Sequence, residues 1–78
     1  MSERQMWDYL GDMLEAARRI VSYIENASFD QFQEDYKTQD AVLRNLEVLG
    51  EAAKNIPEEF RNQYPDLPWE RWRVRAIA

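Results

Sequence analysis

The chain has 78 residues, 10 of them Lys or Arg and 15 Asp or Glu, so its formal net charge is −5. It contains no Cys and no His, which excludes disulfides, a Cys nucleophile, a His general base and a His or Cys metal site within these residues. The acidic balance argues against broad binding to a nucleic-acid backbone. This length allows one domain with a small core, which usually needs support from another chain.

No apolar run approaches the length of a membrane span, and the first residues are not followed by an uninterrupted apolar stretch. We therefore expect no membrane segment and no signal peptide, and the cytoplasm is the expected compartment. All three Pro residues lie at or after position 57. Everything before that position is expected to be helical, apart from short connections.

The first expected helix runs from about residue 3 to residue 25. Ser2 followed by Gln5 fits a capping box, which satisfies free backbone N–H groups at a helix start. Gly11 inside this helix is either a tolerated defect or a place where another backbone approaches closely. The helix carries an apolar stripe at steps of three and four residues, made of Met6, Leu10, Met13, Ala17, Ile20 and Ile24 and widened by Trp7, Leu14 and Val21.

A short second helix is expected from Ser28 to Tyr36, again with a capping-box spacing at its start. The third helix runs from Thr38 to Ile56, with Thr38 as its N-cap. Its apolar residues cover more of the helical wheel than one neighbour requires. We therefore expect it to be the central helix, packed on its own chain and on a second copy. The core and interface residues expected on it are Val42, Leu46, Leu49 and Ala53.

A charged stripe runs along the other side of the third helix, at helical spacing: Asp40, Arg44, Glu47, Glu51 and Lys54. One interpretation is a cleft lining that binds a cation or a polar partner. A metal shared by two Glu is not favoured, because such sites in helical bundles add His ligands and this chain has none. The other interpretation is a solvated face, with Asp40 paired to Arg44. Glu51 and Lys54 would form a second ion pair.

The C-terminal part of the sequence is divided by proline. Pro57 is expected to end the third helix and to start a short new turn through Phe60. The stretch from Tyr64 to Pro68 is a turn or loop. Trp69 to Ala78 is expected to begin a fourth helix, and it has no residue typical of a C-cap. The chain therefore looks truncated inside an element.

A segment at the start of this last helix combines aromatic and basic residues. Three of the ten basic residues, Arg71, Arg73 and Arg75, alternate there with Trp69 and Trp72. Interleaved Trp and Arg can stack on and neutralise single-stranded RNA. The simpler interpretation is a packed pair of Trp rings with exposed Arg side chains.

The run from Lys37 to Lys54 resembles the signature of the HepT-like family, small helical proteins of the HEPN superfamily encoded beside minimal nucleotidyltransferases in toxin–antitoxin pairs. Two further stretches agree with it, residues 8–16 and the Pro-containing segment from Pro57 to Trp69. The resemblance implies an all-α fold, a small antiparallel helical bundle of the HEPN type that forms homodimers. We therefore expect residues 1–78 to be a single, truncated HEPN-like domain.

The resemblance also implies an activity, metal-independent RNA cleavage, which needs no cofactor and is neutralised by the nucleotidyltransferase partner. The family's catalytic motif is an Arg, a His four to six residues further on and a Tyr two residues after the His. Arg73 and Arg75 lie near the expected Arg and are the only candidates, because the chain has no His and no Tyr after Trp69. We therefore expect a partner-binding module without catalysis, which forms a dimer or a higher oligomer. The alternatives are an active ribonuclease with a divergent site, built from these Arg and a carboxylate, and a stand-alone helical dimer with a regulatory role.

Overall fold

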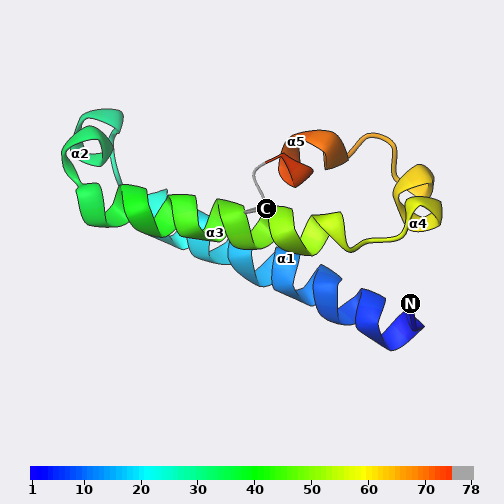
Figure 1. The fold of residues 1–78 in the computed structure, drawn as a ribbon. Helices are drawn as coiled ribbons and strands as arrows, with labels where there is room; N and C mark the ends of the chain where they lie inside the picture. Colours follow the sequence, from blue (N-terminus) through cyan, green and yellow to red (C-terminus); the bar gives the residue numbers. More distant parts are fainter. Residues whose placement is uncertain (75–78) are drawn as a thin grey trace.

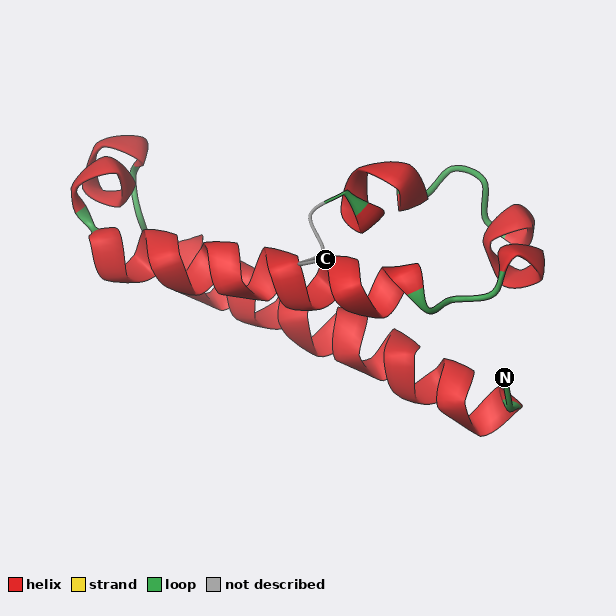
Figure 2. Ribbon diagram, in the orientation of Figure 1, coloured by secondary structure: helices red, strands yellow, loops and turns green. Residues whose placement is uncertain are grey.

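A computed structural model describes residues 1–74 of the chain. This part forms five α-helices and contains no β-strand (Figure 2). The helices are α1 (Glu3–Ile24), α2 (Phe29–Glu34), α3 (Tyr36–Lys54), α4 (Glu58–Gln63) and α5 (Trp69–Arg73). The expectation of an all-α fold is therefore confirmed.

The two long helices form the body of the molecule. Figure 1 shows α1 and α3 side by side and running in opposite directions, with α2 at one end, α4 at the other and α5 over α3. The molecule is elongated, with extents of 42 × 24 × 22 Å. Helix α3 contacts α1, α2 and α5, so it is the central helix, as its broad apolar surface predicted.

The core lies between α1, α3 and α5. Its buried side chains are Met13, Ala16, Leu49, Ala52, Ala53, Ile56 and Trp69. Three of these seven are Ala, and small side chains at the contact let two helix backbones approach closely. Of the four residues expected in the core or an interface, Leu49 and Ala53 are buried, whereas Val42 and Leu46 are half-buried.

Both expected capping boxes are formed. The Ser2 hydroxyl accepts a hydrogen bond from the backbone N–H of Gln5, and the Gln5 side chain accepts one from the backbone of Ser2, each at 3.1 Å. Ser28 and Gln31 repeat this exchange at the start of α2, at 3.1 and 2.9 Å. Reciprocal capping of this kind satisfies two N–H groups that have no partner within the helix.

The predicted N-cap of the third helix is wrong. The cap is Asp35, whose carboxylate accepts hydrogen bonds from the Thr38 backbone N–H at 3.0 Å and the Thr38 hydroxyl at 2.6 Å. These two hydrogen bonds, with Lys37 adding a smaller charge effect, lower the pKa of Asp35 below its ordinary value. The carboxylate outcompetes the Thr hydroxyl as a cap, so α3 begins at Tyr36 and α2 ends at Glu34.

The proline-rich segment follows the prediction closely. Helix α3 ends at Lys54, two residues before the expected Ile56, and Pro57 occupies the N-cap of α4 instead of its first helical position. The expected loop from Tyr64 to Pro68 is present. The expected helix from residue 69 to 78 begins at its predicted start, and α5 is described to residue 73. Residues 75–78 lie outside the described part.

Candidate functional site

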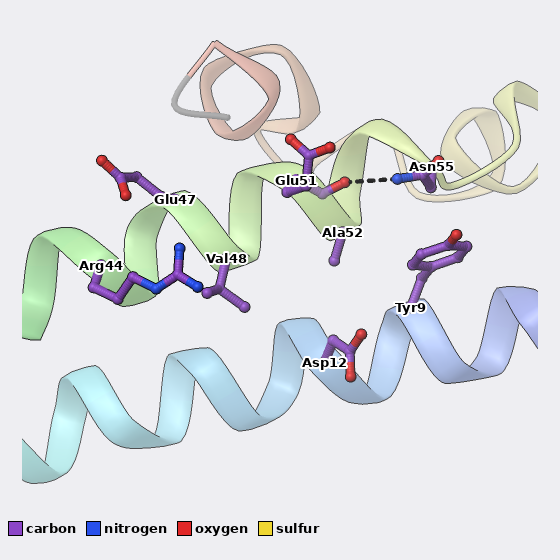
Figure 3. Close-up of a pocket in the computed structure, with 8 residues that line it drawn as sticks. All are labelled: Tyr9, Asp12, Arg44, Glu47, Val48, Glu51, Ala52 and Asn55. Carbon is purple, nitrogen blue, oxygen red and sulfur yellow. Dashed lines mark hydrogen bonds between the residues drawn. The ribbon is translucent and has the colours of Figure 1, made fainter. Parts of the chain in front are cut away.

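A shallow groove of about 250 Å³ lies between α1 and α3 (Figure 3). Three residues of the predicted charged stripe, Arg44, Glu47 and Glu51, line it, and Asp40 lies exposed one turn before Arg44. The remaining lining residues are Tyr9 and Asp12 of α1, Val48 and Ala52 of α3, and Asn55, which is the C-cap of α3. Sequence reasoning missed Tyr9, Asp12 and Asn55. Only the pairing of α1 with α3 brings the first two to the stripe.

The charges of this groove do not converge on one point. In Figure 3 the carboxylates of Glu47 and Glu51 point away from α1, whereas the Arg44 side chain lies along α3. Within residues 1–74, no group of three or more carboxylates is placed to hold a metal ion. The groove can bind a polar partner through separate contacts.

The two ion pairs expected along the charged stripe are not formed. The ion pairs of the described part join Glu15 to Arg19 and Glu70 to Arg61 and Arg73, so Asp40–Arg44 and Glu51–Lys54 are absent there. Exposed side chains lose conformational entropy when held in one geometry, which offsets most of the Coulomb gain. The stripe is therefore a set of separately solvated charges on α3.

Asn45 is a buried polar residue that the sequence analysis did not single out. It is 8% exposed, and its side-chain nitrogen donates a 2.9 Å hydrogen bond to the carbonyl oxygen of Ala41, one helical turn earlier. It also lines a second hollow beside Asp12, Glu15 and Arg19. The sequence feature that could have indicated this burial is a single Asn among the apolar residues of α3.

The aromatic side chains of α5 are packed into the fold. Trp69 is 7% exposed, and its ring meets Trp72 edge-on at a centroid distance of 5.4 Å and Phe60 at 6.5 Å. A ring that is buried between neighbours offers no free face to a base. This arrangement matches the simpler interpretation of the segment, a packed Trp pair, and leaves Trp69 unavailable for RNA stacking.

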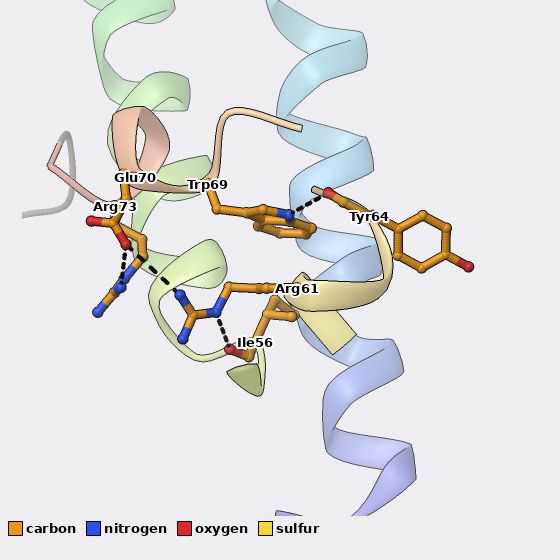
Figure 4. A network of polar contacts seen from close by, with 6 residues as sticks. All are labelled: Ile56, Arg61, Tyr64, Trp69, Glu70 and Arg73. Atoms are coloured by element: carbon orange, nitrogen blue, oxygen red, sulfur yellow. Dashed lines mark hydrogen bonds and ion pairs between the residues drawn. The ribbon is translucent and has the colours of Figure 1, made fainter. Parts of the chain in front are cut away.

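Arg73 is held by a carboxylate of its own helix (Figure 4). Its Nη1 donates a 2.8 Å hydrogen bond to Glu70 Oε1, and Arg61 Nη1 lies 3.8 Å from the same oxygen. Arg61 in turn donates from Nε to the carbonyl oxygen of Ile56 at 3.2 Å. The Nε of Arg73 is shielded from solvent and finds no acceptor among the described residues. Arg75, the second candidate, lies outside the described residues.

The length and polarity of the described helices were compared with those of a membrane-spanning helix. None of its helices is both long enough and apolar enough to cross a bilayer. The two longest, α1 and α3, each carry charged residues on their exposed faces.

Comparison with known proteins identifies relatives of this chain. The family model described as "HepT-like: Ribonuclease HepT-like" matches residues 13–74. A Methanocaldococcus jannaschii protein named "Putative RNase MJ0127" is 46% identical over 70 residues, which are 90% of this chain and 58% of that protein. The "Probable ribonuclease HepT" of Thermococcus cleftensis is 45% identical over 74 residues, 94% of this chain and 67% of that protein. The chain thus spans a little over half of the first relative's length. No solved structure matches it significantly.

Proposed function

Because this chain belongs to the HepT-like ribonuclease family, we propose that it is the helical module of a toxin–antitoxin protein, which dimerises and binds a minimal nucleotidyltransferase but does not cut RNA by itself. The family's activity is metal-independent RNA cleavage, so no cofactor is involved. The expected site of action is the cytoplasm.

The observation that carries the proposal is the absence of His from all 78 residues. Proton transfer in RNA cleavage needs a group that exchanges a proton near neutral pH, and Arg remains protonated there. Arg73 is engaged by Glu70, and Trp69 is buried. The described part of the C-terminal segment is therefore better suited to packing against the core than to RNA cleavage.

Association is supported by the large apolar side chains that the described fold leaves in solvent. Exposed apolar residues on a domain with a small core favour contact with another chain. Several of them lie on α1, α2 and α3, and the more exposed ones include Trp7, Leu14, Val21, Phe29, Tyr36 and Leu43. The groove beside the charged stripe adds polar contacts that a partner can use.

One observation favours the alternative function, an active ribonuclease with a divergent site. Glu70 lies 2.8 Å from Arg73, so a carboxylate and a guanidinium are adjacent at the position where the family motif is expected to begin. In that mechanism the carboxylate exchanges the proton and the Arg stabilises the developing negative charge.

Cleavage of a fluorescent single-stranded RNA by the purified 78-residue chain, with and without EDTA, separates these two functions. We expect no turnover above that of the buffer. Cleavage that persists in EDTA and is lost in both Glu70→Gln and Arg73→Ala supports the divergent site and overturns the proposal. Arg71→Ala, an exposed Arg in the same helix, is the matched control, because it removes an equal charge outside the ion-pair network.

Binding of the nucleotidyltransferase is tested separately. We expect co-expression with a tagged minimal nucleotidyltransferase from a HepT-type gene pair to recover a stoichiometric complex, measured by size-exclusion chromatography with light scattering. Recovery of the nucleotidyltransferase alone, from cells in which the chain is folded and abundant, contradicts the proposed partnership.

A further inference from the structure

Helix α1 carries a second apolar face that the described fold leaves uncovered. Trp7, Leu14 and Val21 are 57%, 56% and 56% exposed. They recur every seven residues, which is nearly two full turns of an α-helix, so the three side chains form one line. We name this line the outer stripe. It is separate from the buried face of α1, to which Met13 and Ala16 belong.

The surface beside the outer stripe is open and slightly hollowed. A shallow hollow lies along it, lined by Leu14, Ala17, Arg18, Val21, Ser22 and Glu25. Among residues 1–74, no atom from another part of the chain lies within 4 Å of the position that a Cβ at Gly11 would take. A Gly beside exposed apolar side chains lets a neighbouring backbone come closer than any other residue would.

A second line with the same spacing flanks the outer stripe: Arg4, Gly11, Arg18 and Glu25. All four residues are exposed. None of the three charged side chains forms an ion pair within the described chain. The two ends of the flanking line therefore carry opposite charges that have no partner in this fold.

We propose that the outer stripe is the surface through which two copies of this chain pair, with α1 packed antiparallel on the α1 of the second copy and Leu14 at the twofold axis. The inference rests on the dimer of the proposed function and deepens it by naming the surface and the register. In an isologous interface, each residue meets the residue equally far from the axis in the other direction. Trp7 and Val21, each seven residues from Leu14, therefore face one another across the two copies.

Charge decides between the two directions of packing. In the antiparallel arrangement, Arg4 and Glu25 lie ten and eleven residues from Leu14, so Arg4 of each copy comes within one residue of the position opposite Glu25 of the other. Two attractive pairs between these long side chains can then form. In a parallel arrangement, Arg4 of one copy and Glu25 of the other lie at opposite ends of the interface, so these attractive pairs cannot form. The antiparallel register also brings Arg18 of one copy to within one residue of the position opposite Gly11 of the other, where the missing side chain leaves room for the long Arg side chain.

The apolar surface continues past the end of the outer stripe. The ring of Trp7 meets Phe60 at a centroid distance of 6.5 Å, and Phe60 meets Tyr64 at 5.0 Å. Tyr64 is 49% exposed. The Val21 end of the second copy would therefore meet a cluster of aromatic rings as well as α1, which extends the buried surface beyond a single helix.

Sedimentation velocity of the purified chain at micromolar concentration tests the surface. We expect a dimer for the unchanged chain and a monomer for Leu14→Lys. The matched control is Leu43→Lys on α3, which replaces a similarly exposed Leu, 50% against 56%, and is expected to remain dimeric. Circular dichroism checks that both variants keep the same helix content. A Leu14→Lys variant that is folded and still dimeric overturns the proposal.

The register is tested by reversing charges and by cross-linking. Arg4→Glu is expected to weaken dimerisation at least tenfold at low salt, and adding Glu25→Arg is expected to restore it, because the attractive pairs then re-form with opposite polarity. Since the chain has no Cys, single Cys substitutions give unambiguous cross-links. Leu14→Cys is expected to form a disulfide-linked dimer, whereas Trp7→Cys alone is not. Cross-linking of Trp7→Cys to itself would show parallel packing and contradict the proposed register.

The failure of this inference is distinguishable from failure of the proposed function. A folded wild-type chain that stays monomeric at every concentration removes the dimer itself. A wild-type dimer that is unaffected by the outer-stripe variants leaves the dimer in place and removes only this surface. A Leu14→Lys variant that stays dimeric but no longer binds the nucleotidyltransferase would assign the stripe to that partner and overturn self-association there.

Discussion

The indole nitrogen of Trp69 donates a 3.0 Å hydrogen bond to the carbonyl oxygen of Tyr64. The bond spans the proline-rich loop between α4 and α5 and ties both of its ends together (Figure 4). Trp69 is also a member of the buried core with Leu49 and Ala53 of α3. One side chain therefore fixes the loop and anchors α5 on the central helix.

Replacement of Trp69 is expected to separate these two contributions. Trp69→Ala removes a buried aromatic ring and should lower the free energy of unfolding by about 3–5 kcal/mol. Trp69→Phe keeps an aromatic ring but leaves the Tyr64 carbonyl without its donor, which should cost about 1–3 kcal/mol. Urea unfolding followed by circular dichroism measures both. Equal losses in the two variants would show that the hydrogen bond accounts for the whole effect and that burial of the ring adds nothing to it.

Ala53 lies in the core and has no exposed surface. Ala53→Leu forces three additional heavy atoms into this contact and should lower the free energy of unfolding by about 1–3 kcal/mol. Ala27→Leu, at an exposed position between α1 and α2, is the control and should change it by less than about 0.5 kcal/mol. Thermal unfolding of the two variants at the same protein concentration provides the measurement. If Ala53→Leu left the free energy of unfolding unchanged, the helices could move apart at that contact without an energetic cost.

Gly11 lies within α1 with open space around it in the single chain. In the monomeric Leu14→Lys background, Gly11→Ala should raise the free energy of unfolding by about 1 kcal/mol, because Ala restricts the unfolded chain and favours helix. Denaturant unfolding at low protein concentration tests this. A destabilised variant would show that Gly11 is needed by the fold of the single chain.

Asp35 makes the stability of the α3 start dependent on pH. Because hydrogen bonds from Thr38 lower its pKa in the folded state, the charged form stabilises folding above the ordinary pKa of an Asp, and this contribution disappears as the pH falls through the lowered value. Asp35→Asn keeps a capping oxygen without the charge. We therefore expect its Tm to lie below that of the unchanged chain at pH 7, and the difference to shrink below about pH 4.

Asp66→Asn, which removes a charge from an exposed loop, controls for the change in net charge. A Tm difference between Asp35→Asn and the unchanged chain that stayed constant from pH 7 to pH 2 would contradict the role given to the Asp35 carboxylate.

Local spacing was sufficient to predict much of the fold. The capping boxes at Ser2 and Ser28 involve residues three apart, and both are formed as expected. The apolar periodicity of α1 and α3 and the stop near Pro57 also depend on neighbours within a turn or two. The error at Thr38 has the same origin, since Asp35 and Thr38 are both good N-caps and only the geometry of the α2–α3 junction selects the carboxylate.

The groove could not be predicted from the sequence in the same way. Tyr9 and Asp12 are more than 30 positions from Arg44, and nothing in their own spacing marks them as its neighbours. The antiparallel approach of α1 and α3 brings them together. The same approach buries Asn45, whose position on the apolar side of α3 carries no sign of function in the sequence.

The sequence by itself determined the all-α class, the two long amphipathic helices, the family and the absence of a His acid or base, because each of these is a property of residue types or of short-range spacing. Tertiary structure alone decided that Trp69 is buried, that Arg61 of α4 approaches Glu70 of α5, and that Trp7, Leu14 and Val21 are left in solvent on α1. Burial depends on which elements meet, and a helix that is apolar on two sides can present only one of them to a single neighbour.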